Sequence, residues 1–487
     1  MMIRPYLTAL ALAPLGVLAN NIQVSNVSLT GKNTTNDTYQ VQFDIGWDNS
    51  WRTSTGEANY DAAWIFIKFR LDPSLPWNHA TLSAAGHSAP SGSTINVPAD
   101  QKGAFIFRNS DGIGNVTFAG AQLQWNYGAS GVPDNAVIEV RVMAVEMVQV
   151  PAGPFAIGDG STSTDIFGQY EAGQTGAAFQ VTGEGSIVLG GNGAGNLNAR
   201  NNGTGFDDYN YSTTQTLPAT YPKGFNAFYG MKYELTEGQY VDFLNMLTPT
   251  QAASRFPNLT GTEGHTIDDN GPLPEIYVSS VPERACGGLS FNSQMAYADW
   301  AALRPMSEFE YEKMCRGNRP AIVGERAWGT AALHASTITL NNTGTANEAL
   351  SGAGITAVAN HININLGNRR PWRSGSIAAG YGIPTRIEAG AGYYGAMELC
   401  GNLVESYVAT GTADARGFLG AAMGDGVLTV AGAADVASWP TVSGSVQRRG
   451  GGYFDSTVRA RVSDRGGASF ALTNVNQTNG CRLGRTP

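Results

Sequence analysis

The sequence predicts an α+β fold in which an N-terminal all-β sandwich precedes a loop-rich mixed domain. Residues 20–147 contain short runs that alternate apolar and polar side chains, without a 3.6-residue apolar stripe. Helical patterns begin only after residue 230, and stretches rich in Gly, Asn, Ser and Thr surround them. A chain of 487 residues is long enough for two domains, and we expect them at 20–147 and 148–487.

The composition excludes several classes of protein. Only 14% of the residues are charged, 62 are Gly and 42% are hydrophobic. General disorder and a collagen-like or coiled-coil rod are therefore not expected. The formal net charge is -9. Because nucleic-acid binding needs a basic face, no nucleic-acid partner is expected.

Residues 1–19 have the pattern of a secretory signal peptide. Arg4 precedes an apolar run, and Val17-Leu18-Ala19 offers a cleavage site before Asn20. A buried N-terminal strand is the alternative. The run is too short for a membrane anchor, and no later apolar stretch approaches eighteen residues, so no membrane span is expected. We therefore expect a secreted or surface-attached protein.

The four cysteines suit an oxidising compartment. An even number permits two disulfides, with three possible connectivities. A zinc site is not expected, because the sequence contains no C-x-x-C pair and no Cys/His cluster. The cysteines are Cys286, Cys315, Cys400 and Cys481.

Strand and helix signals follow the same division. Alternating or β-branched runs at 39–45, 64–70 and 138–142 predict strands of a sandwich. Residues 157–221 are expected to be mainly loops, with a mobile glycine loop at 190–195. Three helices are predicted. One begins at a Thr236/Gln239 capping box, one lies within 290–303, and one begins at a Ser307/Glu310 capping box.

Six short motifs follow one another along the second predicted domain. They are residues 147–158, 233–244, 304–317, 395–405, 449–453 and 480–485, with R-P-M-S-E-F-E-Y-E-K-M-C-R-G at 304–317 and G-A-M-E-L-C-G-N-L-V-E at 395–405. Together they resemble the formylglycine-generating-enzyme (sulfatase-modifying factor) family. The resemblance implies a C-type-lectin-like core for residues 148–487 and does not cover 20–147.

The resemblance does not extend to the family's oxidase chemistry. Its oxidase members bind copper through two cysteines shortly after R-G-G-S, because thiolates hold the cuprous ion. Here those positions fall at or beside Asp455 and near Ala460. No copper, no catalytic residue and no formylglycine generation are therefore expected. An oxidase with a changed metal site is kept as an alternative.

A structural calcium site is the cofactor that the resemblance implies. Matched residue by residue, Glu398, the carbonyls of Gly401 and Leu403, and Glu405 would be the ligands. The alternative is that Glu405 pairs with a C-terminal arginine. From the same family core we expect disulfides between Cys286 and Cys315 and between Cys400 and Cys481.

The C-terminal segment is locally basic inside an acidic chain. Its arginines either form buried ion pairs or belong to an exposed, aromatic-bearing surface that binds a partner. The predicted partner-binding residues are Tyr453, Phe454, Asp455, Arg459 and Arg461.

The sequence thus predicts a secreted, non-catalytic interaction protein that displays loops on a lectin-like core. The partner would be a protein, a surface glycan or a second copy of the chain. A structural subunit that assembles through its β-domain is the other possibility. In that case tryptophans of residues 20–147 would be exposed rather than in the sandwich core; they are Trp47, Trp51, Trp64, Trp77 and Trp125.

Overall fold

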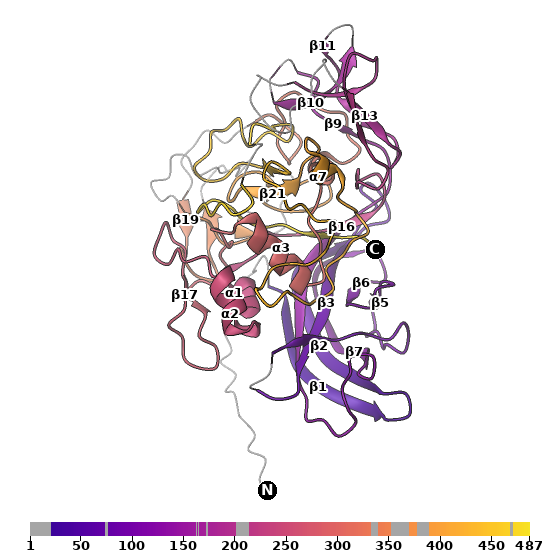
Figure 1. Ribbon diagram of the computed structural model, residues 1–487, viewed down its shortest axis with the longest axis vertical. Helices are drawn as coiled ribbons and strands as arrows, with labels where there is room; N and C mark the ends of the chain where they lie inside the picture. Colours follow the sequence, from indigo (N-terminus) through magenta and orange to yellow (C-terminus); the bar gives the residue numbers. More distant parts are fainter. Residues whose placement is uncertain are drawn as a thin grey trace.

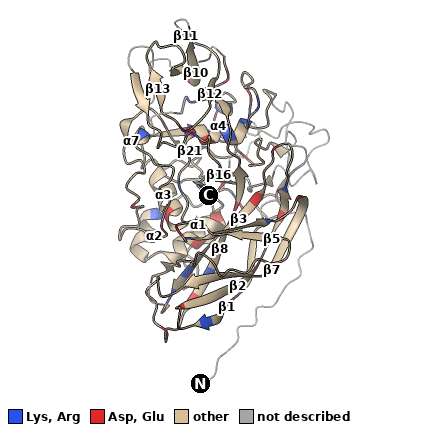
Figure 2. Cartoon of the chain, turned by 90° about the vertical axis from the view of Figure 1, so that its right-hand side faces the viewer, with Lys and Arg blue, Asp and Glu red and all other residues tan. Residues whose placement is uncertain are grey.

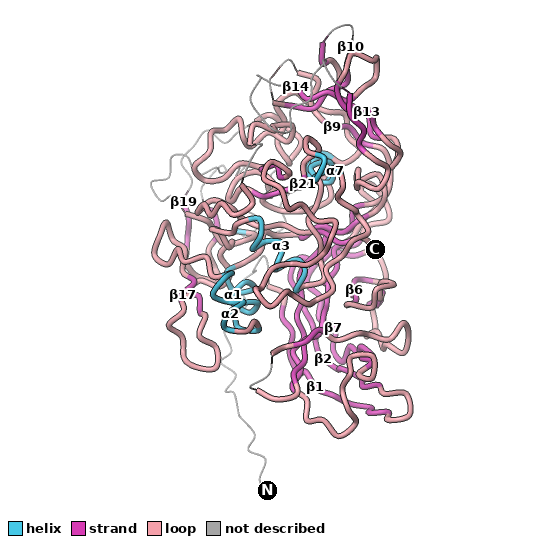
Figure 3. Tube along the Cα trace, viewed as in Figure 1, coloured by secondary structure: helices cyan, strands magenta, loops and turns pink. Residues whose placement is uncertain are grey.

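A computed structural model describes most of the chain after the predicted signal peptide. The described residues are 21–73, 76–161, 163, 165–171, 174–200, 214–332, 339–351, 370–376, 389–467 and 471–487, so the prediction for residues 1–19 lies outside them. Strands and loops dominate, and the few helices are short (Figure 3). The fold is therefore largely β.

Two antiparallel sheets form the N-terminal part. The first has the strand order β1-β2-β7, and the second has the order β23-β16-β8-β3-β6-β5, with β4 paired to β3. The strands are β1 (Gln23–Asn33), β2 (Thr38–Arg52), β3 (Asp61–Arg70), β4 (Asn78–His79), β5 (Ser93–Asn96), β6 (Ala104–Arg108), β7 (Gly112–Asn126), β8 (Glu139–Val150), β16 (Phe228–Met231) and β23 (Gly484–Arg485).

A sandwich core lies between these two sheets. Alternate residues of β2 and β7 point toward alternate residues of β3, as the period-two pattern of the sequence predicts. The tryptophans Trp47 and Trp125 belong to this core and are 2% and 0% exposed. Trp64 is also buried, whereas Trp51 and Trp77 are partly buried. The five tryptophans therefore do not form an exposed assembly surface.

The second sheet is the central layer of the molecule. Strand β3 is buried on both faces: Ile65 and Ile67 face the sandwich core, whereas Trp64 and Phe66 pack on the second part of the chain. Strand β8 passes through the predicted boundary at 147/148 and pairs with β16, which pairs with the C-terminal β23. Figure 1 shows β16 close to the C-terminus of the chain. One continuous sheet thus joins the two predicted domains.

Residues 155–217 are richer in strands than expected. A five-stranded sheet has the order β11-β10-β14-β13-β15, and β9 pairs with β12. The predicted glycine loop at 190–195 is the turn between two of these strands, where positive φ angles at Gly190 and Gly191 favour glycine. The bounds are β9 (Phe155–Ile157), β10 (Ile166–Glu171), β11 (Gln174–Thr175), β12 (Phe179–Val181), β13 (Ile187–Gly190), β14 (Leu197–Arg200) and β15 (Thr214–Leu217).

The three predicted helices are confirmed. Helix α1 (Glu237–Met246) begins at the Thr236 capping box, α3 (Phe291–Trp300) begins after Ser290, and α4 (Glu308–Arg316) begins at the Ser307 capping box. Helix α2 (Pro249–Arg255) was not predicted, although Thr248 and Gln251 form a third capping box, and the short α7 (Ala413–Arg416) was not predicted either.

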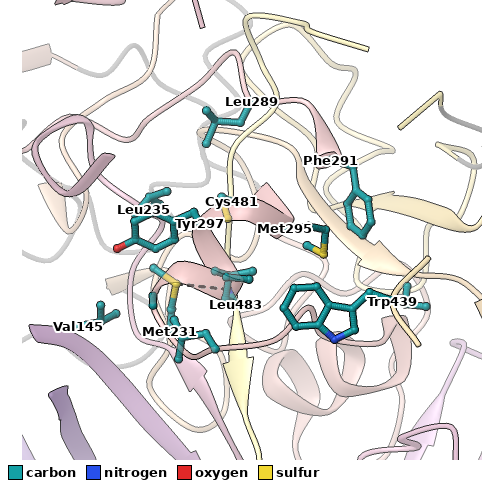
Figure 4. Packing of buried hydrophobic residues seen from close by; sticks show 14 of the residues in the cluster. Val145, Met231, Leu235, Leu289, Phe291, Met295, Tyr297, Trp439, Cys481 and Leu483 are labelled. Carbon is teal, nitrogen blue, oxygen red and sulfur yellow. Dashed lines mark hydrogen bonds between the residues drawn. The ribbon is translucent and has the colours of Figure 1, made fainter. Parts of the chain in front are cut away.

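The helices pack against the central sheet through aromatic side chains. Trp300 lies 5.2 Å from Phe66 of β3 and 5.3 Å from Phe243 of α1, measured between ring centroids. Figure 4 shows part of this core, including Tyr297, Cys481 and Leu483, and the hydrogen bond of 3.3 Å from Leu483 N to Met231 Sδ. The remaining strands pair two by two: β17 (Ile267–Asp268) with β18 (Val278–Ser279), β19 (Thr339–Asn341) with β20 (Ala349–Ser351), and β21 (Glu405–Val408) with β22 (Val446–Arg449).

Within the described residues, no helix combines the length and apolar character needed to cross a bilayer.

Candidate interaction surface

Buried ion pairs fix the C-terminal segment to helix α4. The Nη2 atom of Arg449 lies 2.5 Å from Glu312 Oε1, and the Nε atom of Arg465 lies 2.8 Å from Glu308 Oε2. All four side chains are at most 1% exposed. Burial alone would lower the pKa of Arg449, but Glu312 and Glu308 raise it above its usual value. These arginines therefore have the structural role that the sequence left open.

Two further arginines connect the C-terminus to the rest of the molecule. Arg485 donates to Asp100 at 2.6 Å, which joins β23 to the loop before β6. Arg482 bonds to Glu405 at 2.5 Å and donates to the carbonyl of Met397. Charged residues are scattered over the chain, and many of them are internal (Figure 2).

The segment 453–461 lies at the surface, next to these buried ion pairs. Phe454 is 37% exposed and Val458 is 43% exposed, and the side chain of Arg459 is 38% exposed. Tyr453 differs from the prediction, because it is 0% exposed. It packs under Phe454, with ring centroids 5.0 Å apart. Tyr453 therefore supports the surface and does not belong to it.

The sequence resemblance matches Asp455 and Ala460 to the copper-binding cysteines of the oxidase members. Asp455 Oδ2 accepts a hydrogen bond of 2.8 Å from the backbone N–H of Gly452 and closes a turn. Ala460 is buried in an apolar cluster. Neither an aspartate carboxylate nor an alanine methyl group is a soft ligand.

A hollow of about 420 Å³ opens beside the exposed segment. Arg459 lines it and pairs with Asp464 at 3.1 Å. Arg461 also lines it, and its Nε atom is buried without a hydrogen-bond partner among the described residues. The remaining lining residues are Ser163, Asp165, Ile166, Ser456 and Val458. Asp464 lines the hollow as well, so the surface combines apolar side chains with two arginines and two aspartates, Asp165 and Asp464.

The predicted calcium turn is held by protein groups. Glu405 is bound by Arg482 and by the hydroxyl of Tyr407. Glu398 Oε1 accepts the N–H of Gly375 at 2.9 Å, while Oε2 is buried without a partner among the described residues. The geometry corresponds to the arginine alternative for Glu405, and the calcium site stays a prediction.

A third carboxylate, missed in the sequence, lies in the same cluster. Glu234 Oε1 accepts the N–H of Leu403 at 3.0 Å, and its other oxygen accepts the side-chain amide of Asn402. The N–H of Gly401 donates to the carbonyl of Gly450. Burial raises the pKa of Glu234 well above its usual value, and Glu405 raises it further. Glu234 belongs to the 233–244 motif, but only the fold brings it to residues 401–403.

The cysteines have neighbours that differ from the predicted pairs. All four are buried and present as thiols. Cys286 N donates to the carbonyl of Leu235, and Leu235 N donates to the carbonyl of Cys481, so Leu235 lies between these two cysteines. Cys315 and Cys400 share an apolar cluster and the neighbour Tyr311. The predicted pairings of Cys286 with Cys315 and of Cys400 with Cys481 therefore join residues of different clusters.

One acidic cluster was not expected from the sequence. Ligand-type oxygens of Asp299, Asp425 and Asp435 lie within 4.8 Å of one another. Asp299 already accepts backbone N–H groups of Asp425 and Asp435, at 2.9 and 3.1 Å. The ammonium group of Lys68 is close by and donates to the carbonyl of Gly426. These carboxylates could bind a cation only in competition with the protein's own donors.

The histidines in the described residues have backbone partners. His79 contacts the carbonyl of Lys102, His87 that of Ser83, and His265 that of Gln477. Burial lowers the pKa of His265 to about 4, which favours the neutral ring.

The fold and this surface define a largely β protein whose exposed loop rests on buried ion pairs. No protein-family model matches the chain, and no curated protein is significantly similar to it in sequence.

Proposed function

We propose that this chain is an exported, non-catalytic interaction protein of the formylglycine-generating-enzyme type. The ordered motifs between residues 147 and 487 support a C-type-lectin-like core for this part. The signal-like pattern of residues 1–19 supports export. Asp455 and Ala460, in place of the two cysteines, support the loss of copper chemistry.

The observation that carries the proposal is the contrast between the C-terminal arginines. Arg449 and Arg465 are buried in ion pairs with helix α4, whereas Arg459 and Arg461 line a surface hollow. Buried ion pairs with good geometry fix a segment without contributing a free surface charge. The buried ion pairs thus fix the segment that exposes Phe454, Val458 and arginine side chains.

Because two arginines and two aspartates line the hollow, this surface suits a protein partner with an apolar segment that carries charges of both signs. Exposed aromatic and arginine side chains are the residue types that contribute most to protein–protein interfaces. Self-assembly through the β-domain has weaker support. The edge strand β1 has irregular register between Ser25 and Ser28 and carries Lys32, and both features oppose edge-to-edge pairing.

A photo-crosslinking experiment tests the proposal. The residue p-benzoylphenylalanine is placed at Phe454 in the exported chain, and crosslinks are mapped by mass spectrometry. Val188, which is 45% exposed in the separate five-stranded sheet, is the control position. We expect one heterologous protein to be crosslinked from position 454 and not from position 188.

The other outcomes separate the alternatives. Crosslinks from position 454 to a second copy of the chain would favour the structural subunit. The absence of any crosslink specific to position 454 would contradict the interaction surface. Copper-dependent oxygen consumption with a cysteine-bearing sulfatase peptide would favour the oxidase alternative instead.

A further inference from the structure

A second hollow, of about 520 Å³, lies between the N-terminal sheets and the segment 389–397. Four aromatic residues line it: Trp51, Tyr233, Tyr393 and Tyr394. It has no lining residue in common with the hollow beside Arg459 and Arg461. A mostly apolar cavity of this size is typical of a small-ligand site.

Local backbone features bring Trp51 into this hollow. The pairing of β2 with β7 shifts register between Trp47 and Ser50, and Asn49 has a positive φ of 52°. Opposite this bulge, Gly395 has a φ of 89°. A Cβ atom at this position would lie 2.5 Å from the Trp51 ring, so only glycine lets the two segments approach.

Hydrogen bonds hold the aromatic walls together. Trp51 Nε1 donates to Asn59 Oδ1 at 3.4 Å, and Asn59 Nδ2 donates to the carbonyl of Tyr394 at 2.9 Å. Asn59 is 2% exposed. The walls therefore come from both parts of the chain and are fixed before any ligand binds, which reduces the entropic cost of binding.

The one ammonium group of the lining is fully engaged. Lys232 Nζ donates to the carbonyl of Asn49 at 3.2 Å, to Asp61 at 3.1 Å and to Glu146 at 3.0 Å. An ammonium group has three N–H donors, so none remains for an anionic ligand. The two carboxylates also offset its positive charge. An anion is therefore disfavoured in this hollow.

Three polar groups of the lining make no hydrogen bond to the described residues. They are the side-chain amide of Asn49, the carboxylate of Glu57 and the hydroxyl of Tyr394. Burial, followed by Tyr393 and Glu57, raises the pKa of Tyr394 to about 12, so its hydroxyl keeps its proton and can donate. The lining thus offers donors and acceptors next to aromatic surface.

We propose that this hollow binds a neutral saccharide ring. A pyranose has a C–H face that packs against aromatic rings and an edge of hydroxyl groups that both donate and accept. The aromatic walls suit the face, and Asn49, Glu57 and Tyr394 suit the edge. This assignment does not depend on the partner surface at Phe454, because the two sites have separate residues.

Titration of the intact mature chain with methyl glycosides tests the proposal. The probes are the methyl glycosides of glucose, galactose, mannose and N-acetylglucosamine, followed by calorimetry and tryptophan fluorescence. Cyclohexylmethanol is the comparison ligand, because it has a similar ring without the hydroxyl edge. We expect at least one glycoside to bind with a dissociation constant of about 1 mM or lower, and more tightly than cyclohexylmethanol.

Two variants examine the polar groups. Glu57→Gln and Tyr394→Phe each keep the shape of the side chain. The first exchanges a charged acceptor for a neutral amide and the second removes a hydroxyl, so each should weaken glycoside binding about tenfold. Asp269→Asn, which removes a carboxylate from an exposed loop outside the hollow, should leave binding unchanged.

Three results would overturn the saccharide assignment. None of the four glycosides binds, or cyclohexylmethanol binds as tightly as the best glycoside, or both variants bind like the unaltered chain. Each of these results leaves the crosslinking test at Phe454 unaffected, so the two proposals fail separately.

Discussion

At the scale of single residues, buried charges in this chain depend on particular partners. Arg482 is 1% exposed, and its guanidinium contacts Glu405 and two backbone carbonyls. Burial alone would lower the pKa of Arg482, but Glu405, Tyr407 and Glu234 raise it well above the usual range. The guanidinium therefore neutralises a cluster of carboxyl groups in the core.

Arg482→Met should lower the free energy of unfolding by about 3–5 kcal/mol, because it leaves a carboxylate buried without its cation. Urea unfolding followed by fluorescence measures the change. The matched control is Arg459→Met, whose ion pair is partly exposed and should contribute about 1 kcal/mol or less. Equal losses in the two variants would contradict the structural role of Arg482.

Glu398 should make stability fall as the pH rises. Burial raises its pKa from 4.5 to about 7 in the folded chain. Between these values the unfolded chain releases the proton while the folded chain keeps it, so the stabilisation present at pH 4.5 is lost toward pH 7. In Glu398→Gln, the free energy of unfolding should fall by about 3 kcal/mol less over this pH range than in the parent. Urea unfolding at pH 4.5, 5.5 and 7 measures it, and parallel pH profiles of variant and parent would refute the assignment.

The positions of the thiols predict which cysteines can be joined. If the exported chain is oxidised, disulfides should link Cys286 with Cys481 and Cys315 with Cys400, since each pair shares neighbours in the core. Peptide mapping without reduction identifies the pairs. Cys400→Ser should then expose one titratable thiol at Cys315 after denaturation and leave the other bridge intact. A bridge between Cys286 and Cys315 would contradict this arrangement.

At the scale of secondary-structure elements, capping residues determine where the helices begin. Thr236 accepts from the N–H of Gln239 at 3.2 Å, and the side chain of Gln239 accepts from the N–H of Thr236 at 3.1 Å. Behind this box, Tyr240, Phe243 and Leu244 face the core. Capping boxes of this kind predicted the starts of α1 and α4, whereas the helix at α3 was predicted only as lying within residues 290–303.

Thr236→Ala should lower the free energy of unfolding by about 1 kcal/mol, because one N–H at the start of α1 loses its acceptor. Thr236→Ser keeps the hydroxyl and is the control, with a smaller expected loss. Thermal unfolding of the three proteins provides the comparison. A serine variant as unstable as the alanine variant would indicate that the methyl group, and not the cap, is responsible.

At the scale of the whole molecule, the two halves of the chain share one sheet. Trp64 Nε1 donates to the carbonyl of Ala301 at 2.9 Å, and Lys68 Nζ donates to that of Trp300 at 2.7 Å. Both donors lie on β3 and both acceptors lie at the end of α3. The buried face of β3 is thus completed by residues more than two hundred positions away.

Residues 20–147 expressed alone should therefore not fold cooperatively. The cut removes the end of β8 and exposes Trp64, Phe66 and the ammonium group of Lys68. Exposure of this apolar face favours aggregation or a loosely packed state. Dispersion of amide signals in an NMR spectrum tests the fragment, with the full mature chain as the control. A well-dispersed spectrum would show an independent domain.

Features that depend on neighbouring residues could be predicted from the sequence. Alternation along 39–45 and 64–70 predicted strands β2 and β3, and the capping boxes predicted helix starts, since both signals act over a few positions. The predicted partner contacts of Phe454, Arg459 and Arg461 stay a prediction; Phe454 and Arg459 are partly exposed, and Arg461 lines a surface hollow.

Contacts between distant segments could not be predicted from local sequence signals and follow from the packing of the folded chain. The pairing of β8 with β16 and β23, the partner of Glu405 and the neighbours of the four cysteines all join residues far apart in the chain. The sequence around a buried charge or thiol does not identify its partner, because that partner is selected by packing and by the need to satisfy buried polar groups. For the same reason the hollow between Trp51 and Tyr394 exists only in the folded molecule.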